Sequence, residues 1–505
     1  MKAKYIIVYL VSIFLGTTSC SKSFLKEETD PNYLTLTNFW KTEGDIIKGL
    51  TSAYSHLQPN MSWGTPFERH IVVDNYRSDE LDFRADVTAW LQVATFVNTS
   101  TNSISKSEWT LLYRGINYAN QCIDNIPKVV SAADDFRARA IAEARFLRAY
   151  YYYRLYLNYG ENIPLYTKEI KGTDEEFFPK QAAPGEIIAF LVKELSEIQA
   201  ILPEPGFYSA KDAGRINRYA ASAILGKLYM FVHQLDKAET EFAKIIGKFE
   251  LMDNYEHNFD GLHKNNKESI FEVQYSGDRT AGRREFNRIA LHLASSNAEG
   301  YEEAYPSTWL FETLKKDKTL NGGYSDRLYS TIIFNDPKSD AFYFENGKSF
   351  LDYHRDGEIF WKKFVSWDPS LSEHWTQSAF NFPLVRYADV LLLYAECLNN
   401  RGATTTAIDL INTVRGRVNV IPIASSLTKE QVLKHLQDIE RPSELALEGG
   451  RWYDLIRWGI TEEALKAHNK PYVANFVKSK HQLFPIPHDE FLLNPEWIQN
   501  PNFSK

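Results

Sequence analysis

The stretch that decides the fold is residues 225–242, LGKLYMFVHQLDKAETEF. Leu225, Gly226 and Tyr229 are followed by Ala238, twelve residues after the glycine, and then by Phe242. This is the spacing of a tetratricopeptide repeat, in which a small residue on the first helix lets the second helix approach closely. The segment therefore predicts two helices packed as a hairpin.

A weaker copy of the same pattern lies much later in the chain. Tyr394, Ala395 and Leu398 are followed by Ala407, again twelve residues after the small residue, and by Ile411. Either copy alone could arise by chance, but the two together favour helix-hairpin repeats. Because they stand far apart, we expect degenerate repeats rather than a regular solenoid.

Helical periodicity extends over much of the rest of the chain. Apolar residues recur at helical spacing over 43–57, 106–130, 135–159, 184–201 and 215–233. Residues 58–105 and 255–380 lack this periodicity, and the second region carries short strand-like runs such as 269–275. We therefore predict a mostly α fold, a tetratricopeptide-like helix-pair scaffold with an inserted loop-rich, minor-β region.

The chain divides by composition into five parts. We expect a signal peptide over 1–19, a lipidated tether and lead-in over 20–40, and N-terminal helical repeats over 41–254, with the loop block 58–105 inside them. The loop-rich inserted region then occupies 255–380, and C-terminal helical repeats with a wrapping tail occupy 381–505.

The N-terminus has the pattern of an exported lipoprotein. Lys2 and Lys4 precede an apolar run over 5–16, and small residues lead to Cys20. The run is too short to span a bilayer, which takes about 20 residues, so it is typical of a cleaved signal. We expect lipidation at Cys20 and attachment to outer-membrane lipid at the cell surface. The alternative is an ordinary secreted protein in which Cys20 is incidental.

Composition excludes some classes of function. The 505 residues carry a net charge of −8, and no Lys/Arg-rich run is present, which argues against a nucleic-acid partner. Only Cys122 and Cys397 remain after Cys20. Each lies in a helical apolar pattern, so we expect buried free thiols rather than a disulfide or a metal pair.

Several ordered motifs together resemble one known family. They are Trp109 to Asn120 (WTLLYRGINYAN), Ala142 to Tyr150 (AEARFLRAY), Arg386 to Leu392 (RYADVLL), and Glu440 to Gly459 (ERPSELALEGGRWYDLIRWG). On these the chain is identified as a member of the SusD/RagB family of outer-membrane nutrient-binding lipoproteins. One departure is Pro442, which removes a backbone donor and is expected to start a new helical turn.

The resemblance implies both a fold and a role. It implies four tetratricopeptide-like helix pairs, a loop-rich face that binds an oligosaccharide or polysaccharide, and a SusC-like TonB-dependent porin as partner. It implies capture without catalysis and without a cofactor. The alternatives are capture of peptides or another nutrient by the same fold, a surface glycosidase, and a repeat scaffold with no small ligand.

The candidate ligand-binding residues are aromatic and polar side chains in the two non-helical regions. A flat ring covers the apolar C–H face of a sugar, while Asp, Asn and Arg bond its hydroxyl groups. The resemblance places ligand contacts in these regions without assigning single residues. The first region offers Trp63, Asp74, Asn75, Arg77, Asp82, Phe83, Arg84, Trp90 and Asn98, and the second offers Tyr301, Tyr324, Trp361, Trp367 and Trp375.

Patterns of catalysis and metal binding are weak. Glu440, Glu444 and Glu448 are spaced by four, which places them on one helix face, and we interpret them as structural partners of nearby arginines. The chain has no H-E-x-x-H, G-x-S-x-G or paired C-x-x-C motif. Asp317 begins a segment like a calcium loop that has Leu328 where a bidentate Glu is required, so a calcium site stays an open question.

Overall fold

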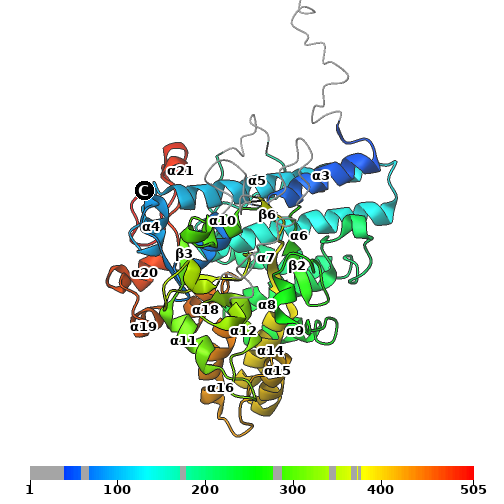
Figure 1. The fold of residues 1–505 in the computed structure, drawn as a ribbon. Helices are drawn as coiled ribbons and strands as arrows, with labels where there is room; N and C mark the ends of the chain where they lie inside the picture. Colours follow the sequence, from blue (N-terminus) through cyan, green and yellow to red (C-terminus); the bar gives the residue numbers. More distant parts are fainter. Residues whose placement is uncertain are drawn as a thin grey trace, which may run out of the picture.

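The computed structural model describes residues 39–58, 68–170, 178–276, 287–339, 349–365, 372–373 and 377–505. The fold is mostly helical, as the periodicity predicted, and its strands are short (Figure 1). No helix in these ranges is long and apolar enough to cross a membrane.

Eight helices form one continuous array in which each packs against the next. The array can be followed in Figure 1 from the blue α3 to the yellow α15. Two of the neighbours, α9 and α14, are adjacent although the whole loop-rich region separates them in sequence. The helices pair as α3 (Glu43–Ser55) with α5 (Ser103–Asn125), α6 (Asp134–Tyr159) with α7 (Glu186–Ile198), α8 (Arg218–Phe231) with α9 (Leu235–Ala243), and α14 (Tyr387–Asn400) with α15 (Thr404–Arg417).

Small residues set the distance between neighbouring helices. A Cβ added to Gly226 on α8 would lie 2.5 Å from the Phe242 ring on α9, and one added to Gly115 on α5 would lie 2.6 Å from the Tyr151 ring on α6. Neither contact is compatible with a side chain at the glycine. The glycine of the repeat pattern therefore has the role that its spacing predicted.

Side-chain caps fix where the long helices begin. Asn102 accepts hydrogen bonds from the backbone N–H groups of Ile104 and Ser105 at the start of α5. Asn217 does the same for Tyr219 and Ala220 at the start of α8. These bonds satisfy donors that have no partner within the helix.

The loop-rich region is held together by two-stranded antiparallel sheets. They pair β1 (Leu81–Phe83) with β3 (Ala304–Pro306), β2 (Ser269–Val273) with β8 (Phe382–Arg386), β4 (Ile332–Ile333) with β5 (Phe360–Trp361), and β6 (Ser372–Glu373) with β7 (Gln377–Ser378). Three helices lie among these strands: α10 (Ile289–Leu293), α11 (Thr308–Lys316) and α12 (Asp326–Thr331). Because β8 runs directly into α14, the β2–β8 sheet joins this region to the helix array.

Shorter helices complete the C-terminal part: α16 (Lys429–His435), the π-helix η9 (Leu436–Glu440), α17 (Arg441–Leu445), α18 (Arg451–Trp458), α19 (Thr461–Ala467), α20 (Lys478–His481) and α21 (His488–Leu493). The tail lies back against the end of α6. Phe484 donates its backbone N–H to Asn158 at 2.6 Å, and the Asn500 side chain donates to the Tyr159 carbonyl at 2.8 Å.

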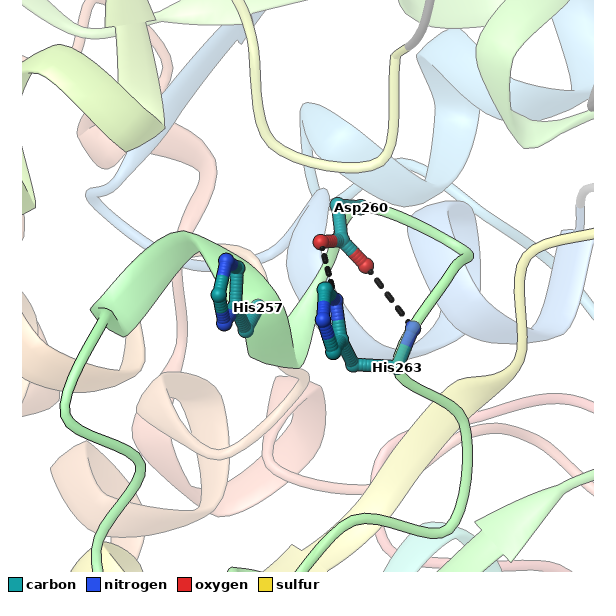
Figure 2. Close-up of side chains that lie close together, drawn as sticks. All are labelled: His257, Asp260 and His263. Carbon is teal, nitrogen blue, oxygen red and sulfur yellow. Dashed lines mark hydrogen bonds and ion pairs between the residues drawn. The ribbon is translucent and has the colours of Figure 1, made fainter.

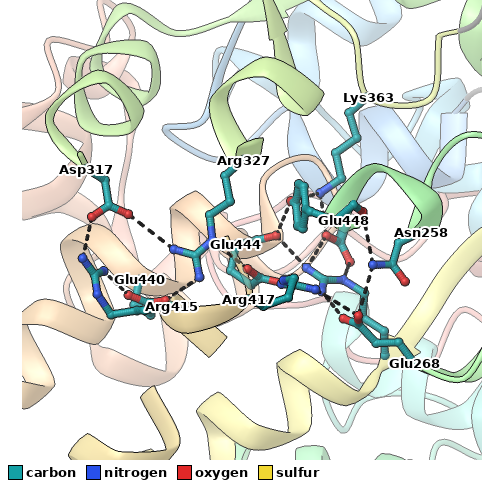
Figure 3. A network of polar contacts seen from close by, with 12 residues as sticks. Asn258, Glu268, Asp317, Arg327, Lys363, Arg415, Arg417, Glu440, Glu444 and Glu448 are labelled. Carbon is teal, nitrogen blue, oxygen red and sulfur yellow. Dashed lines mark hydrogen bonds and ion pairs between the residues drawn. The ribbon is translucent and has the colours of Figure 1, made fainter. Parts of the chain in front are cut away.

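A buried network of ion pairs joins α12, β8, α15, η9 and α17 to one another and to loop residues around them (Figure 3). Arg327 donates to Glu444 at 2.7 Å and to Glu440 at 2.6 Å, and neither side of these pairs is exposed. The members are the carboxylates Glu268, Asp317, Glu440, Glu444 and Glu448 and the cations Arg327, Lys363, Arg386, Arg415 and Arg417. Equal numbers of opposite charges let the group be buried.

The three glutamates of the sequence motif are structural, as interpreted, but only two share a helix face: Glu440 and Glu444 both contact Arg327, whereas Glu448 lies beyond the helix end. Glu440 ends η9, Glu444 lies in α17, and Glu448 follows the end of that helix at Leu445. Pro442 stands in the first turn of α17, where its missing N–H costs no bond. Although burial alone raises the pKa of Glu444, the guanidinium groups of Arg417, Arg386 and Arg327 hold it at about 2.

Both cysteines of the described chain are free and buried, as expected from their helical setting. Burial raises the pKa of the Cys122 thiol to about 12 and that of the Cys397 thiol above its ordinary value. The third cysteine, Cys20, lies outside the described residues, so its lipidation stays a prediction.

Candidate functional site

A row of aromatic rings begins and ends at rings that solvent reaches and passes through buried rings between them. Tyr301 is 47% exposed at one end, and the half-buried Tyr472 is at the other. Neighbouring ring centroids lie 5.5–6.2 Å apart, in stacked or edge-on geometry. The order of the rings is Tyr472, Phe83, Tyr76, Trp90, His292 and Tyr301.

The β1–β3 pair and the segment before β3 position the exposed end of this row. The register places Asp82 opposite Tyr305 and Phe83 opposite Ala304. Tyr301 donates its backbone N–H to the Leu291 carbonyl at 2.7 Å, which ties the segment to α10. Gly300 allows this approach, because a Cβ there would lie 2.1 Å from the Ala294 carbonyl oxygen.

A charged group stands beside Tyr301. Arg84 contacts Asp86 at 2.5 Å and Glu303 at 3.2 Å, and the side chains of Arg84 and Asp86 are 44% and 50% exposed. Burial raises the pKa of Glu303 to about 7, which Arg84 only partly offsets, and Asp86 raises it further by sharing a hydrogen bond. The hydrogen bond from Arg84 lowers the pKa of Asp86. Near neutral pH this group therefore offers both donors and acceptors.

We call Asp82, Phe83, Arg84, Asp86, Tyr301 and Glu303 the Tyr301 surface. It combines an exposed phenol ring with charged groups that the backbone holds in place, since Arg84 also donates its N–H to the Glu303 carbonyl at 3.0 Å. A ring face suits the C–H face of a sugar, and the surrounding groups suit its hydroxyl groups. Arrangements of this kind bind neutral polar ligands without chemical change.

Four of the predicted site residues, Asp82, Phe83, Arg84 and Tyr301, lie on this surface. Asp82 is half-buried, and its carboxylate receives a hydrogen bond from Lys470 at 2.7 Å. Tyr324 lies elsewhere, in the turn before α12, where Lys318 sits 3.6 Å from its ring centroid. The structure therefore does not bring Tyr324 to the same surface.

The polar residues before β1 were expected in an open loop, and this expectation needs correction. Residues 69–80 are all buried. Asp74 pairs with Arg154 of α6 at 2.5 Å, Asn75 accepts the Gly449 N–H at 3.2 Å, and Arg77 donates to Asn158 at 2.8 Å. These partners satisfy charges that would otherwise be costly to bury, so Asp74, Asn75 and Arg77 hold the core together.

Three more predicted contacts are buried side chains. Trp90 is 6% exposed and lies in the middle of the aromatic row, Asn98 is 5% exposed, and Trp361 is fully buried in β5. A ring enclosed on both faces has no surface for a sugar, so the structure assigns Trp90 and Trp361 to packing. The predictions for Trp63, Trp367 and Trp375 fall outside the described residues.

Sequence reasoning missed Asp86, Glu303 and Tyr472. Glu302 and Glu303 follow Tyr301 directly in the sequence, and this pair of acidic residues could have predicted polar groups around the ring. Nothing local pointed to Tyr472, because it meets Phe83 only through the fold, with 5.5 Å between ring centroids.

A hollow elsewhere on the protein is an alternative ligand site to the Tyr301 surface. About 500 Å³ in volume, it lies between α5 and α21, and its lining includes Tyr113, Tyr118, Tyr166 and Trp497. Tyr118 is 40% exposed there. Trp109, at the base, already donates its indole N–H to Glu490 at 3.1 Å.

Comparison with known families accounts for nearly the whole chain. Residues 267–503 match the model of the SusD family, and residues 23–230 match a related model described as starch-binding and associating with the outer membrane. The chain belongs to the SusD family. Its curated relatives include SusD-like protein P38 of Formosa agariphila, 25% identical over 98% of both chains. A SusD-like protein of Bacteroides ovatus is 26% identical over 91% of this chain and 83% of its own.

Solved structures of the SusD family superpose over the same extent. A SusD superfamily protein from Bacteroides vulgatus has a TM-score of 0.80 at 26% identity, covering 92% of this chain and 99% of its own. A laminarin-binding SusD-like protein has a TM-score of 0.75 at 25% identity, covering 92% and 100%. The helix array and the loop-rich region therefore follow the architecture of the family.

Proposed function

We propose that this SusD-family protein captures an oligosaccharide or polysaccharide at the cell surface and holds it without chemical change. The Tyr301 surface carries the proposal, because it sets an exposed ring beside fixed donors and acceptors. The matching family model described as starch-binding and the laminarin-binding relative support glycan as the ligand class. A ligand on such a preformed surface loses less entropy on binding than one that must order a flexible loop.

The spacing of the carboxyl groups supports binding rather than hydrolysis. Glycosidases need two carboxyl groups about 5–9.5 Å apart, with room for the sugar or a water between them. On the Tyr301 surface the carboxyl groups of Asp86 and Glu303 share a hydrogen bond and contact the same arginine. A pair this close leaves no space for the scissile bond.

Delivery to a transporter completes the proposal. The apolar run and Cys20 support a lipid anchor, and the matching model described as associating with the outer membrane supports that location. The partner would be a SusC-like TonB-dependent porin that receives the glycan. Replacing Cys20 with serine should release the protein from the membrane fraction and abolish its co-purification with such a porin in mild detergent. Unchanged membrane attachment would contradict the lipid anchor.

The decisive experiment is calorimetric titration of the protein without residues 1–20 against laminarin, starch and other oligosaccharides, with analysis of each mixture for cleavage products. We expect saturable binding to one glycan class and intact ligand. Product release would contradict capture without catalysis. Binding of peptides in place of every glycan would contradict the ligand class.

A further inference from the structure

Three metal-binding side chains converge on the loop after α9, apart from the Tyr301 surface. His257 lies in the short 3-10 helix η5 (Tyr255–Asn258), and Asp260 and His263 follow it (Figure 2). One nitrogen of each imidazole and one carboxylate oxygen all lie within 4.8 Å of one another. His257 and Asp260 are half-buried and His263 is exposed, so solvent reaches the group.

The backbone holds the carboxylate in place. Oδ1 of Asp260 accepts the N–H groups of Leu262 at 2.8 Å and His263 at 3.1 Å. Its other oxygen, Oδ2, lies 2.7 Å from Nδ1 of His263. One oxygen thus fixes the turn while the other faces the imidazole.

The two histidines are brought together by the same turn. Their rings stack with 3.8 Å between centroids and 12° between planes. Asn266 donates to the backbone carbonyl of His263 at 3.0 Å and to Asn258 at 3.2 Å, which ties the two ends of the turn. Gly261 has φ +75, and a Cβ there would lie 2.4 Å from the Phe380 ring, so the turn requires a glycine.

We propose that His257, Asp260 and His263 form a binding site for a divalent first-row transition cation such as Zn²⁺. Two imidazoles and one carboxylate are the donor set that these cations prefer, whereas calcium and magnesium favour oxygen alone. Zinc–ligand distances are about 2.0–2.2 Å, so the stacked rings must open and rotate for the three atoms to surround one ion. Water fills the remaining positions from the exposed side.

The nitrogen with which His263 binds the ion determines whether a proton must leave. A metal-bound imidazole nitrogen cannot also carry hydrogen, so any proton that His263 Nδ1 shares with Asp260 passes to solvent if that nitrogen binds the ion. If Nε2 binds instead, Asp260 keeps the hydrogen bond and orients the ring, as carboxylates do around many zinc histidines. Both arrangements use the same three residues.

The cation would stiffen a turn that is already joined to β2. The Asn265 side chain donates to Gln274 at 2.8 Å, and Lys264 donates to the Tyr275 carbonyl at 2.9 Å. Asn265 and Asn266 also line a hollow of about 460 Å³ beside Phe249 and Tyr208. A bound ion would therefore fix one wall of that hollow.

The test is competitive titration of Zn²⁺ against a chromogenic chelator, using tag-free protein without residues 1–20. We expect one tight equivalent in the unmodified protein. Its affinity should fall by at least roughly tenfold in His257→Ala and in His263→Ala, because each removes a ligand. Asp260→Asn keeps an oxygen for the turn but loses the charge, so it should also weaken binding while the protein stays folded.

His233→Asn is the matched control, since His233 is exposed, has φ +59 and lies outside the cluster. Asparagine tolerates that backbone conformation, and zinc affinity should be unchanged. Equal affinity in all the variants would overturn the proposal, and so would an unmodified protein that takes up no zinc. The visible absorption of bound Co²⁺ gives a second readout, and its persistence in His257→Ala would also contradict the site.

Discussion

Gly226 of α8 and Phe242 of α9 are in such close contact that a Cβ on the glycine would lie 2.5 Å from the ring. The ring fills the space that a side chain would need, and the two helices approach each other over this point. The same pair marks the first and last strong positions of the repeat pattern in the sequence.

This contact predicts that adding one methyl group at Gly226 destabilises the protein. Gly226→Ala should lower the free energy of unfolding by about 1–3 kcal/mol, because the Phe242 ring must move. Gly416→Ala is the matched control: this glycine also lies in a helix, α15, and its Cβ would meet nothing within 4 Å. The control should be neutral or stabilise by up to about 1 kcal/mol, because alanine favours a helix more than glycine does. Urea unfolding measures both, and equal effects would contradict the packing argument.

The buried ion network predicts a large loss when one cation is removed. Arg327→Met keeps much of the apolar stem but leaves Glu440 and Glu444 with fewer partners. We expect destabilisation of roughly 3 kcal/mol, because uncompensated buried charge is costly. Lys434→Met should change stability by less than about 1 kcal/mol, because its pair with Asp438 is exposed. A similar small change in Arg327→Met would show that the network reorganises without cost.

The Tyr301 surface predicts which ring binds the glycan. Tyr301→Ala should weaken binding of the glycan found by titration by roughly tenfold, the loss expected for one stacked ring. Tyr118→Ala removes a tyrosine of similar exposure from the hollow between α5 and α21 and should have no effect. Calorimetry of both variants decides between the two places, since the opposite pattern would move the site to that hollow.

The raised pKa of Glu303 predicts a pH-dependent stability term. Its pKa of about 7 in the folded protein exceeds the ordinary 4.5, so the folded state binds the proton more tightly than the unfolded chain. The contribution of protonated Glu303 to the free energy of unfolding is therefore complete below pH 4.5. It is lost as the pH rises to about 7, and above that pH it changes no further. Glu303→Gln should match the unmodified protein near pH 5 and exceed its stability at pH 8 by about 1–3 kcal/mol. Parallel stability curves from pH 5 to 8 would contradict the assignment.

The helix array was predictable because its rules are local. Small residues at fixed spacing, such as Gly226 and Ala238, determine a helix hairpin wherever they occur, and α6 ends at Gly160 as its sequence indicated. Local sequence patterns do not show how the helices are arranged relative to one another in space. The contact of α9 with α14 depends on the inserted region folding back, and no local pattern encodes it.

The polar block before β1 shows where sequence reasoning failed. A run with Asp74, Asn75 and Arg77 has the composition of an exposed loop, because polar side chains usually lie in water. Their partners, Arg154, Gly449 and Asn158, stand far away in sequence and meet them only in the folded protein. The same limit hid Tyr472, whereas Asp82 and Arg84 were found because both are polar and solvent reaches both side chains.

The inert thiols of Cys122 and Cys397 make this protein a convenient substrate for chemical labelling. Both are enclosed in helices, and burial raises their pKa, so neither offers the thiolate that alkylating reagents attack. In the protein without residues 1–20, a cysteine introduced at an exposed position would be modified alone, without first removing Cys122 and Cys397. A dye could thus be placed next to Tyr301 or near His263 to report glycan or metal binding directly in the native fold.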